Sequence, residues 1–237
     1  MADKATTGLA ASLAHGVATA AKAGAPLYVG EGNSCSCGGK AGVSDVWAAA
    51  VWALDALFSV AAVGVDRWAF HGMPRGPYST FSWADTTNDA VEVRPLFYGL
   101  LGFATAARAG SVLLAVDTVH SSNAFVKAWS VVDAAGTTRI ILIHKDPAQG
   151  LSNCSITVAP VAPLKGAARL TRGLPGPAGL RSSSSDAISF GGLSWATTTN
   201  GEPSGAPTDE AVPAGSGGDF AFALPPASFA ILTLPPA

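Results

Sequence analysis

The stretch at residues 26–45 reads PLYVGEGNSCSCGGKAGVSD, and it says more about the fold than any other part of the chain. It opens with a short apolar run, residues 26–30, which is typical of a short strand. The acid Glu31 follows at once, and a loop rich in Gly, Ser and Cys continues to Gly42. In barrel enzymes the catalytic side chains lie where a strand ends and its loop begins. Many strands also end in an acid that only caps a loop, so this pattern alone leaves catalysis by Glu31 open.

Outward from this stretch, helix and strand patterns alternate over the first 110 residues. Apolar spacing predicts two short strands, at residues 26–30 and 65–70, and three helices, at residues 9–23, 44–63 and 96–109. We expect Ser44 to cap the second helix and Gly64 to end it. Such alternation indicates a parallel sheet or a (β/α) barrel. Two strands cannot close a barrel, which needs eight.

After Gly110 the pattern changes to short β segments separated by turn residues. Seven such segments predict an antiparallel β-sandwich. Residues 172–185 and 200–218 are interpreted as surface loops because of their Gly, Pro and Ser content. The predicted fold class is therefore α/β plus all-β: a partial (β/α)8 barrel at residues 1–110 and a C-terminal β-sandwich domain at residues 111–237.

Composition limits the possible partners. The chain has 237 residues, a net charge of −2 and only 13% charged residues, so we expect neither nucleic acid nor an anionic membrane surface as a partner. Residues 46–65 are long and apolar enough to suggest a membrane span. Asp55 lies at their centre, where a charge costs about 3 kcal/mol, so a buried helix is favoured. The Ala-rich first 25 residues resemble a transit peptide, but an amphipathic helix is favoured.

Cysteine and histidine spacing gives no sign of a cofactor. Three cysteines are not a disulfide framework, and Cys35 and Cys37 are too close together to form a metal site by themselves. The four histidines show no ligand spacing. We expect no metal and no other cofactor. A cysteine-dependent hydrolase is disfavoured because no His and acid signature accompanies these thiols. The glycosylation triplet at Asn153 gives weak support for a secretory route.

Several segments together resemble glycoside hydrolase family 79, the heparanase and β-glucuronidase group. The segments GEGNSCSCGG at residues 30–39 and GVSD at residues 42–45 are similar to the region of that family which carries the nucleophile. The segment GVDRWAFHG at residues 64–72 resembles the next barrel strand, and PLFYGLL at residues 95–101 resembles the helix that closes the barrel. Further on, FGGLSW at residues 190–195 and LPPASFAIL at residues 224–232 look like the C-terminal β domain of the family.

The resemblance implies a retaining mechanism that uses two carboxyl groups about 5–5.5 Å apart. Glu31 matches the nucleophile position. In this family the acid/base Glu comes from an earlier strand, which this chain does not contain. The loop acids Asp85, Asp89 and Glu92 could approach the site, but we interpret them as solvated, because a general acid needs a fixed geometry.

The expected function is the C-terminal portion of a retaining glycosidase that acts on glucuronides or uronic-acid glycans. It is expected to be inactive alone and to need an N-terminal barrel segment. The alternative is a non-catalytic β-sandwich protein for structural support or glycan contact. The resemblance also implies a secreted, extracellular, lysosomal or vacuolar location.

Three further residues are substrate-binding candidates. Asn33 could line the pocket or hold the loop turn, since Asn often bonds to nearby backbone. Tyr78 matches the loop aromatic that helps to bind the uronic acid carboxylate in the family. His71, at the end of the second strand, could face the site or belong to the core. Ser36 stands where some family members carry an aromatic pocket residue, and this departure weakens the implied glucuronide specificity.

Overall fold

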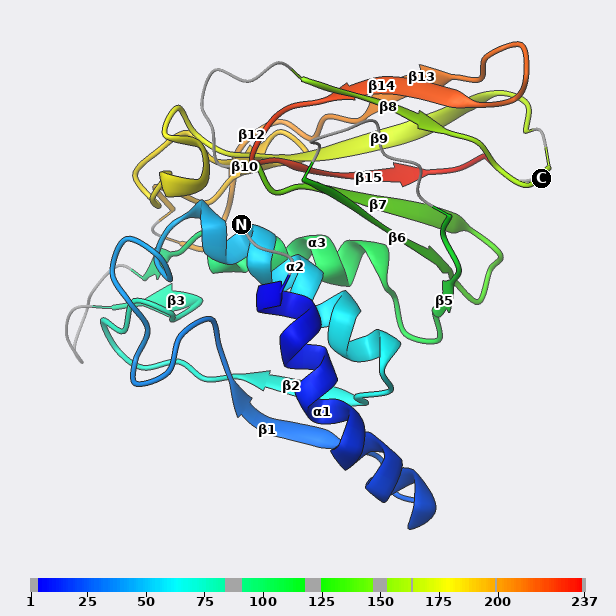
Figure 1. Cartoon of the computed structure of the whole chain (residues 1–237). Coiled ribbons are helices and arrows are strands. Elements are labelled where there is room, and N and C mark those ends of the chain that lie inside the picture. The colour runs from blue at the N-terminus through cyan, green and yellow to red at the C-terminus, as the bar shows by residue number, and fades with distance from the viewer. Residues whose placement is uncertain are drawn as a thin grey trace.

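The structure is a computed structural model that describes residues 4–83, 91–117, 125–146, 153–162, 164–198 and 200–235 (Figure 1). The helical part consists of α1 (Lys4–Lys22), β1 (Tyr28–Gly32), α2 (Trp47–Ala62), β2 (Arg67–Phe70), the short strands β3 (Phe81–Ser82) and β4 (Glu92–Val93), and α3 (Leu96–Ala106). The strands that follow are β5 (Val112–Leu114), β6 (Val126–Val132), β7 (Thr138–His144), β8 (Cys154–Val158), β9 (Ala167–Leu174), β10 (Ser189–Phe190), β11 (Leu193–Ser194), β12 (Ser204–Gly205), β13 (Glu210–Pro213), β14 (Phe220–Leu224) and β15 (Phe229–Thr233). A 3-10 turn, η1 (Gly179–Arg181), precedes β10.

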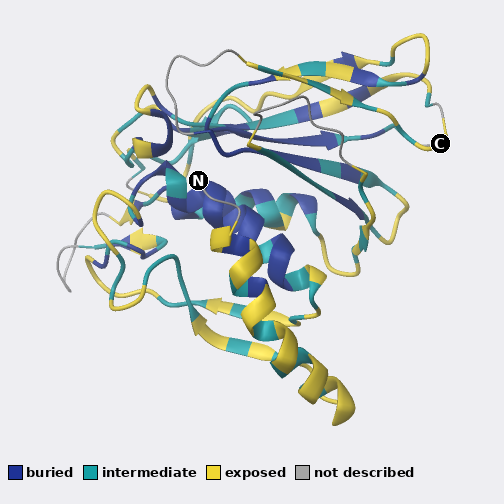
Figure 2. Cartoon of the chain, in the orientation of Figure 1, coloured by how far each residue is buried: buried dark blue, intermediate teal, exposed yellow. Residues whose placement is uncertain are grey.

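The strands β1 and β2 pair in parallel, as the alternating pattern predicts. Trp52 of α2 packs edge-on against Phe70 of β2, and Leu9 of α1 joins the same apolar cluster. This packing covers one side of the pair. Much of β1 is exposed, as the yellow ribbon in Figure 2 shows, and Tyr28 keeps 53% of its surface accessible.

The helix α2 begins later than expected, and Ser44 is not its cap. Val46 occupies the N-cap position without a side-chain hydrogen bond. The Ser44 hydroxyl instead accepts hydrogen bonds from the Lys40 N–H at 3.0 Å and from the Ser34 hydroxyl at 2.9 Å. The prediction was wrong because a contact distant in sequence takes over: the Trp47 N–H donates to the Ser182 carbonyl at 2.7 Å. The helix ends before Gly64, whose φ of 95° fits its predicted role as the stop.

The chain after Ser111 forms antiparallel strands, as predicted. The largest sheet has nine strands in the order β12-β11-β10-β9-β15-β7-β6-β5, with β13 pairing beside β9. A smaller sheet, β14-β8, lies above β9 and β15 in Figure 1. Part of the segment interpreted as loops is strand: β9 continues to Leu174, and β12 and β13 lie within residues 200–218. The strand β13 is defined by its pairing with β9, some 40 positions earlier, and β12 by its pairing with β11, and local composition reveals neither partner.

One apolar core joins the helical part to the large sheet. Trp47 of α2 is fully buried, stacks on Phe229 of β15 with ring centroids 5.8 Å apart, and donates its indole N–H to the Ala227 carbonyl at 2.6 Å. Phe58, further along α2, stacks on Trp129 of β6. Side chains of α2 and of the large sheet therefore belong to the same apolar core.

The predicted buried position of Asp55 is confirmed, and its charge is compensated. The carboxylate is fully buried and contacts the ammonium groups of Lys127 at 3.1 Å and Lys145 at 2.5 Å. It also accepts hydrogen bonds from the Trp129 indole at 2.9 Å and the Thr6 hydroxyl at 2.5 Å.

Within the described part of the chain, no helix is long and apolar enough to cross a membrane.

A cavity of about 550 Å³ separates the small sheet from one end of the large sheet. Its walls include Val126 and Ile140 from the large sheet and Ile156 and Val158 from β8. Among the described strands β8 pairs only with β14, so its other edge is open. In the described part of the chain, no strand pairing therefore joins the two sheets on this side.

Candidate active site

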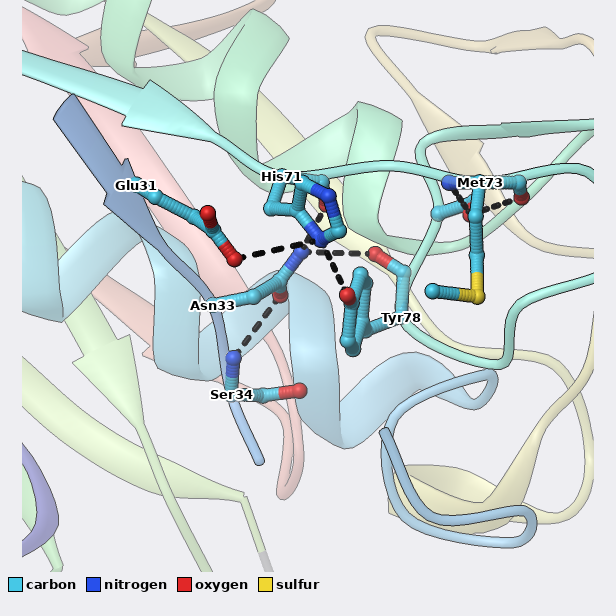
Figure 3. Close-up of polar contacts among 7 residues, drawn as sticks. Glu31, Asn33, Ser34, His71, Met73 and Tyr78 are labelled. Carbon is cyan, nitrogen blue, oxygen red and sulfur yellow. Dashed lines mark hydrogen bonds and ion pairs between the residues drawn. The ribbon is translucent and has the colours of Figure 1, made fainter. Parts of the chain in front are cut away.

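Glu31 and His71 meet where the two parallel strands end. Glu31 lies in β1, and its side chain is 69% exposed. His71 follows β2 directly, and its backbone N–H donates to the Gly32 carbonyl at 3.2 Å, which continues the strand pairing. The imidazole Nδ1 of His71 lies 3.5 Å from Oε1 of Glu31 (Figure 3). Parallel pairing thus brings together two residues 40 positions apart in the sequence.

Tyr78 completes this group from the loop after β2. Only 4% of the residue is exposed, and its hydroxyl is hydrogen-bonded to Nδ1 of His71. The same ring nitrogen therefore faces Glu31 on one side and Tyr78 on the other, as Figure 3 shows. The exposed carboxylate is linked to a buried phenol through one imidazole.

The Asn33 side chain holds the two loops together. Its Nδ2 donates to the carbonyls of His71 at 2.8 Å and Tyr78 at 2.9 Å, and its Oδ1 accepts from the Ser34 N–H at 2.8 Å. These bonds are the loop-holding role that was one of the two possibilities for Asn33. They fix the backbone of His71, which lies beside Glu31, and of Tyr78, which is bonded to His71.

Two supporting residues were not found from the sequence. A Cβ at Gly39 would lie 2.8 Å from the backbone nitrogen of Tyr78, so only glycine lets these loops touch. Arg94 donates from Nη1 to the carbonyls of Gly76 at 3.1 Å and Pro77 at 3.3 Å. The Gly38-Gly39 doublet was a visible signal, whereas a single Arg before a helix carries none.

Glu92, the loop acid that the structure describes, is engaged elsewhere than at Glu31. Glu92 pairs with Arg94 at 3.4 Å and accepts a hydrogen bond from the Ser184 hydroxyl. Asp85 and Asp89 lie outside the described residues. Within the described ranges, no group of three or more His, Cys, Asp or Glu side chains could hold a metal ion.

Comparison with solved structures shows that the fold of this chain is shared with glycoside hydrolases. No family model and no curated protein sequence matches the chain. Solved structures that match include an α-L-arabinofuranosidase from Thermotoga maritima (TM-score 0.60, 10% identity, 99% of this chain and 50% of that one). A GH30 endoxylanase from Clostridium papyrosolvens C71 also matches (TM-score 0.55, 13% identity, 91% of this chain and 43% of that one). The chain therefore has a glycoside hydrolase fold.

A higher similarity is to a 4-O-α-L-rhamnosyl-β-D-glucuronidase from Fusarium oxysporum 12S. The TM-score is 0.78 at 22% identity, over 98% of this chain and 50% of that one. The chain spans about half the length of these structures.

Proposed function

We propose that this chain is the C-terminal portion of a retaining glycosidase of family 79, with Glu31 as the nucleophile. The observation that carries the proposal is the position of Glu31: an exposed carboxylate at the end of a parallel strand, next to His71, in a glycoside hydrolase fold. Strand C-termini are where barrel enzymes place catalytic groups.

In this proposal the helical part, residues 1–110, is the end of a (β/α)8 barrel, and residues 111–237 are the attached β-sandwich. The parallel pair with α1 and α2 on it supports the first assignment. The remaining strands, and the acid/base carboxyl, belong to an N-terminal barrel segment. A retaining reaction needs both carboxyl groups about 5–5.5 Å apart, so this chain alone is inactive.

The chemistry assigned to the site follows from its contacts. Glu31 attacks the anomeric carbon of the sugar and forms a glycosyl-enzyme, and water then releases the sugar. His71, 3.5 Å from Oε1, orients the Glu31 carboxylate through its ring nitrogen. Asn33 and Arg94 keep the loop of Tyr78 in place.

A glucuronide or uronic-acid glycan is the proposed substrate. The His71 imidazole lies beside the nucleophile with a side chain that is 38% exposed, so a ring N–H can donate to a sugar carboxylate, and the buried Tyr78 hydroxyl is bonded to the same ring. The glucuronidase from Fusarium oxysporum 12S supports the same substrate class.

The test is a chimaera in which residues 24–237 replace the matching half of that glucuronidase. We expect hydrolysis of an aryl β-glucuronide by the chimaera and a loss of at least about 1,000-fold in kcat with Glu31→Gln, because a covalent step loses its nucleophile. A mechanism-based fluoroglucuronide should label Glu31. The matched control, Glu202→Gln, removes an exposed acid from the segment between β11 and β12, which carries none of the site residues, and should leave kcat unchanged.

Three results would contradict the proposal or part of it. A folded chimaera whose hydrolysis survives Glu31→Gln would show that Glu31 is not the nucleophile. Hydrolysis by the chain alone that is abolished by Glu31→Gln would show that both carboxyls lie within it. A folded chimaera that binds glycan without turnover would favour the alternative, a non-catalytic sandwich protein.

A further inference from the structure

The loop that follows the strand of Glu31 carries two thiols separated by one residue. Cys35 is half-buried and Cys37 is exposed, and neither is in a disulfide. The Cα atoms of residues two positions apart, such as residues 35 and 37, lie roughly 5–7 Å from each other, depending on the bend of the backbone. Disulfides join Cα atoms about 4.4–6.8 Å apart. The two ranges overlap, so the backbone spacing allows a bridge between residues 35 and 37.

Both ends of this loop are anchored to the site. On one side the Asn33 amide bonds to the backbone of His71 and Tyr78, and the Ser34 hydroxyl bonds to that of Ser44 at 2.9 Å. On the other side Gly39 packs against the backbone of Tyr78. A covalent link between residues 35 and 37 would therefore stiffen the segment that joins these two anchors.

We propose that Cys35 and Cys37 form a reversible disulfide that locks the loop beside Glu31. The oxidant is a small-molecule disulfide. The exposed Cys37 thiolate attacks one of its sulfurs, breaks the S–S bond and releases one thiolate. The Cys35 thiolate then attacks the Cys37 sulfur of the mixed disulfide and releases the second. Two protein thiols lose two electrons and two protons, and the small disulfide becomes two thiols.

Reversibility follows from the size of the ring, because it encloses only Ser36. Strained or exposed disulfides have more oxidising potentials and are the labile ones. Cys154 lies in β8, far along the chain from this loop, and serves as an internal reference thiol. The chemistry does not depend on glycosidase activity, so its test is separate from that of the proposed function.

The experiment equilibrates the whole chain in glutathione buffers of increasing oxidised fraction, followed by acid quenching, alkylation and peptide mass mapping. We expect the peptide with both loop cysteines to lose two hydrogens in most molecules at the oxidising end, reversibly with dithiothreitol, while Cys154 remains alkylated. Cys154→Ser should keep the bridge. Cys35→Ser should stop at a glutathione adduct on Cys37.

Amide exchange gives the second readout. Bridging should slow hydrogen exchange in residues 37–39 and in the Tyr78 loop, residues 71–79. Alkylation of both loop thiols at every buffer ratio, or pairing through Cys154, would overturn the proposal. A bridge that leaves exchange in residues 71–79 unchanged would overturn its link to the site.

Discussion

Asp55 is a buried carboxylate on α2 that contacts two lysines from the sheet side. Asp55→Asn keeps the volume but removes the negative charge that both ammonium groups contact. Breaking a buried ion pair on one side costs about 3–5 kcal/mol, because the remaining charge stays desolvated. We expect a loss of that order in the free energy of unfolding, measured by urea denaturation. The exposed control Glu202→Gln should change it by less than about 0.5 kcal/mol, and equal effects would contradict the assignment.

Asp133 is a second acid whose charge is stabilised, in the turn between β6 and β7. The Arg139 guanidinium at 2.8 Å and the N–H groups of Thr137 and Ala135 hold the pKa of the Asp133 carboxyl below its usual range. A folded pKa below the unfolded one contributes stability above the unfolded pKa, and this is lost as the pH falls through the folded pKa. Asp133→Asn should therefore lower the Tm at neutral pH.

The pH dependence supplies the check. The Tm difference between the wild type and Asp133→Asn should be largest near pH 7 and shrink below about pH 4, the unfolded pKa of Asp. Thermal melts in matched salt from about pH 3 to about pH 7 measure this difference in Tm. That range runs from about one unit below the unfolded pKa to about three units above it. A difference that stays constant over the series would show that the carboxyl is not held in its charged form.

Among the site residues, the sequence predicted the three that lie together but did not predict the residues that hold their loops in place. Glu31, His71 and Tyr78 were named, and the structure brings them together. The strand ends could be located because apolar runs stop there. Arg94 could not be found, because its role depends on carbonyls presented by a loop fold that no local pattern encodes.

The crossing of α2 and α3 depends on one glycine. A Cβ at Gly99 would lie 2.2 Å from the carbonyl oxygen of Ala50. Alanine is intrinsically better than glycine in a helix by about 1 kcal/mol. Gly99→Ala should nevertheless destabilise the protein by about 1–3 kcal/mol, because the helices must move apart.

A matched control lies in α1. At Gly8 the nearest atom to an added Cβ is Cγ of Lys4 at 3.6 Å, an ordinary contact. Gly8→Ala should therefore stabilise the chain slightly, by up to about 1 kcal/mol. Chemical denaturation of both variants compares them directly, and two changes of the same sign would argue against the tight crossing.

At the scale of elements, local patterns located most helices and long strands. They failed where a distant contact decides. Ser44 has a side chain that commonly caps helices. The first N–H of α2, that of Trp47, instead donates to the carbonyl of Ser182, which comes from the other half of the chain. Strand β13 looked like a loop, because its four residues become a strand only beside β9.

At the scale of the whole molecule, one edge of β8 is unpaired among the described strands and lies next to the cavity between the sheets. The outer edge of β8 has no partner among the described strands. Exposed edges of this kind pair with other chains, and a lysine on the edge opposes such pairing. We expect concentration-dependent association of the purified chain, and Thr157→Lys, an exposed position on β8, should reduce it.

Sedimentation velocity over a range of concentrations measures this effect. The control Thr197→Lys adds the same charge at an exposed turn and should leave association unchanged. Equal suppression by both variants would assign the effect to net charge. A chain that stays monomeric throughout would show that the β8 edge does not recruit a second copy.

The stacking of Trp47 on Phe229 has a consequence for the exchange of parts between enzymes. A recombination point at residues 110–111 looks natural from the change of pattern, yet it would assign the two aromatic rings to different parents. The helix α2 of one parent would then pack on a β15 that evolved against the helix of the other parent. Exchange of a segment that contains both Trp47 and Phe229 keeps the two rings from one parent. Chimaeras with a recombination point before residue 47 should therefore fold, and those with a point between residues 47 and 229 should fold poorly.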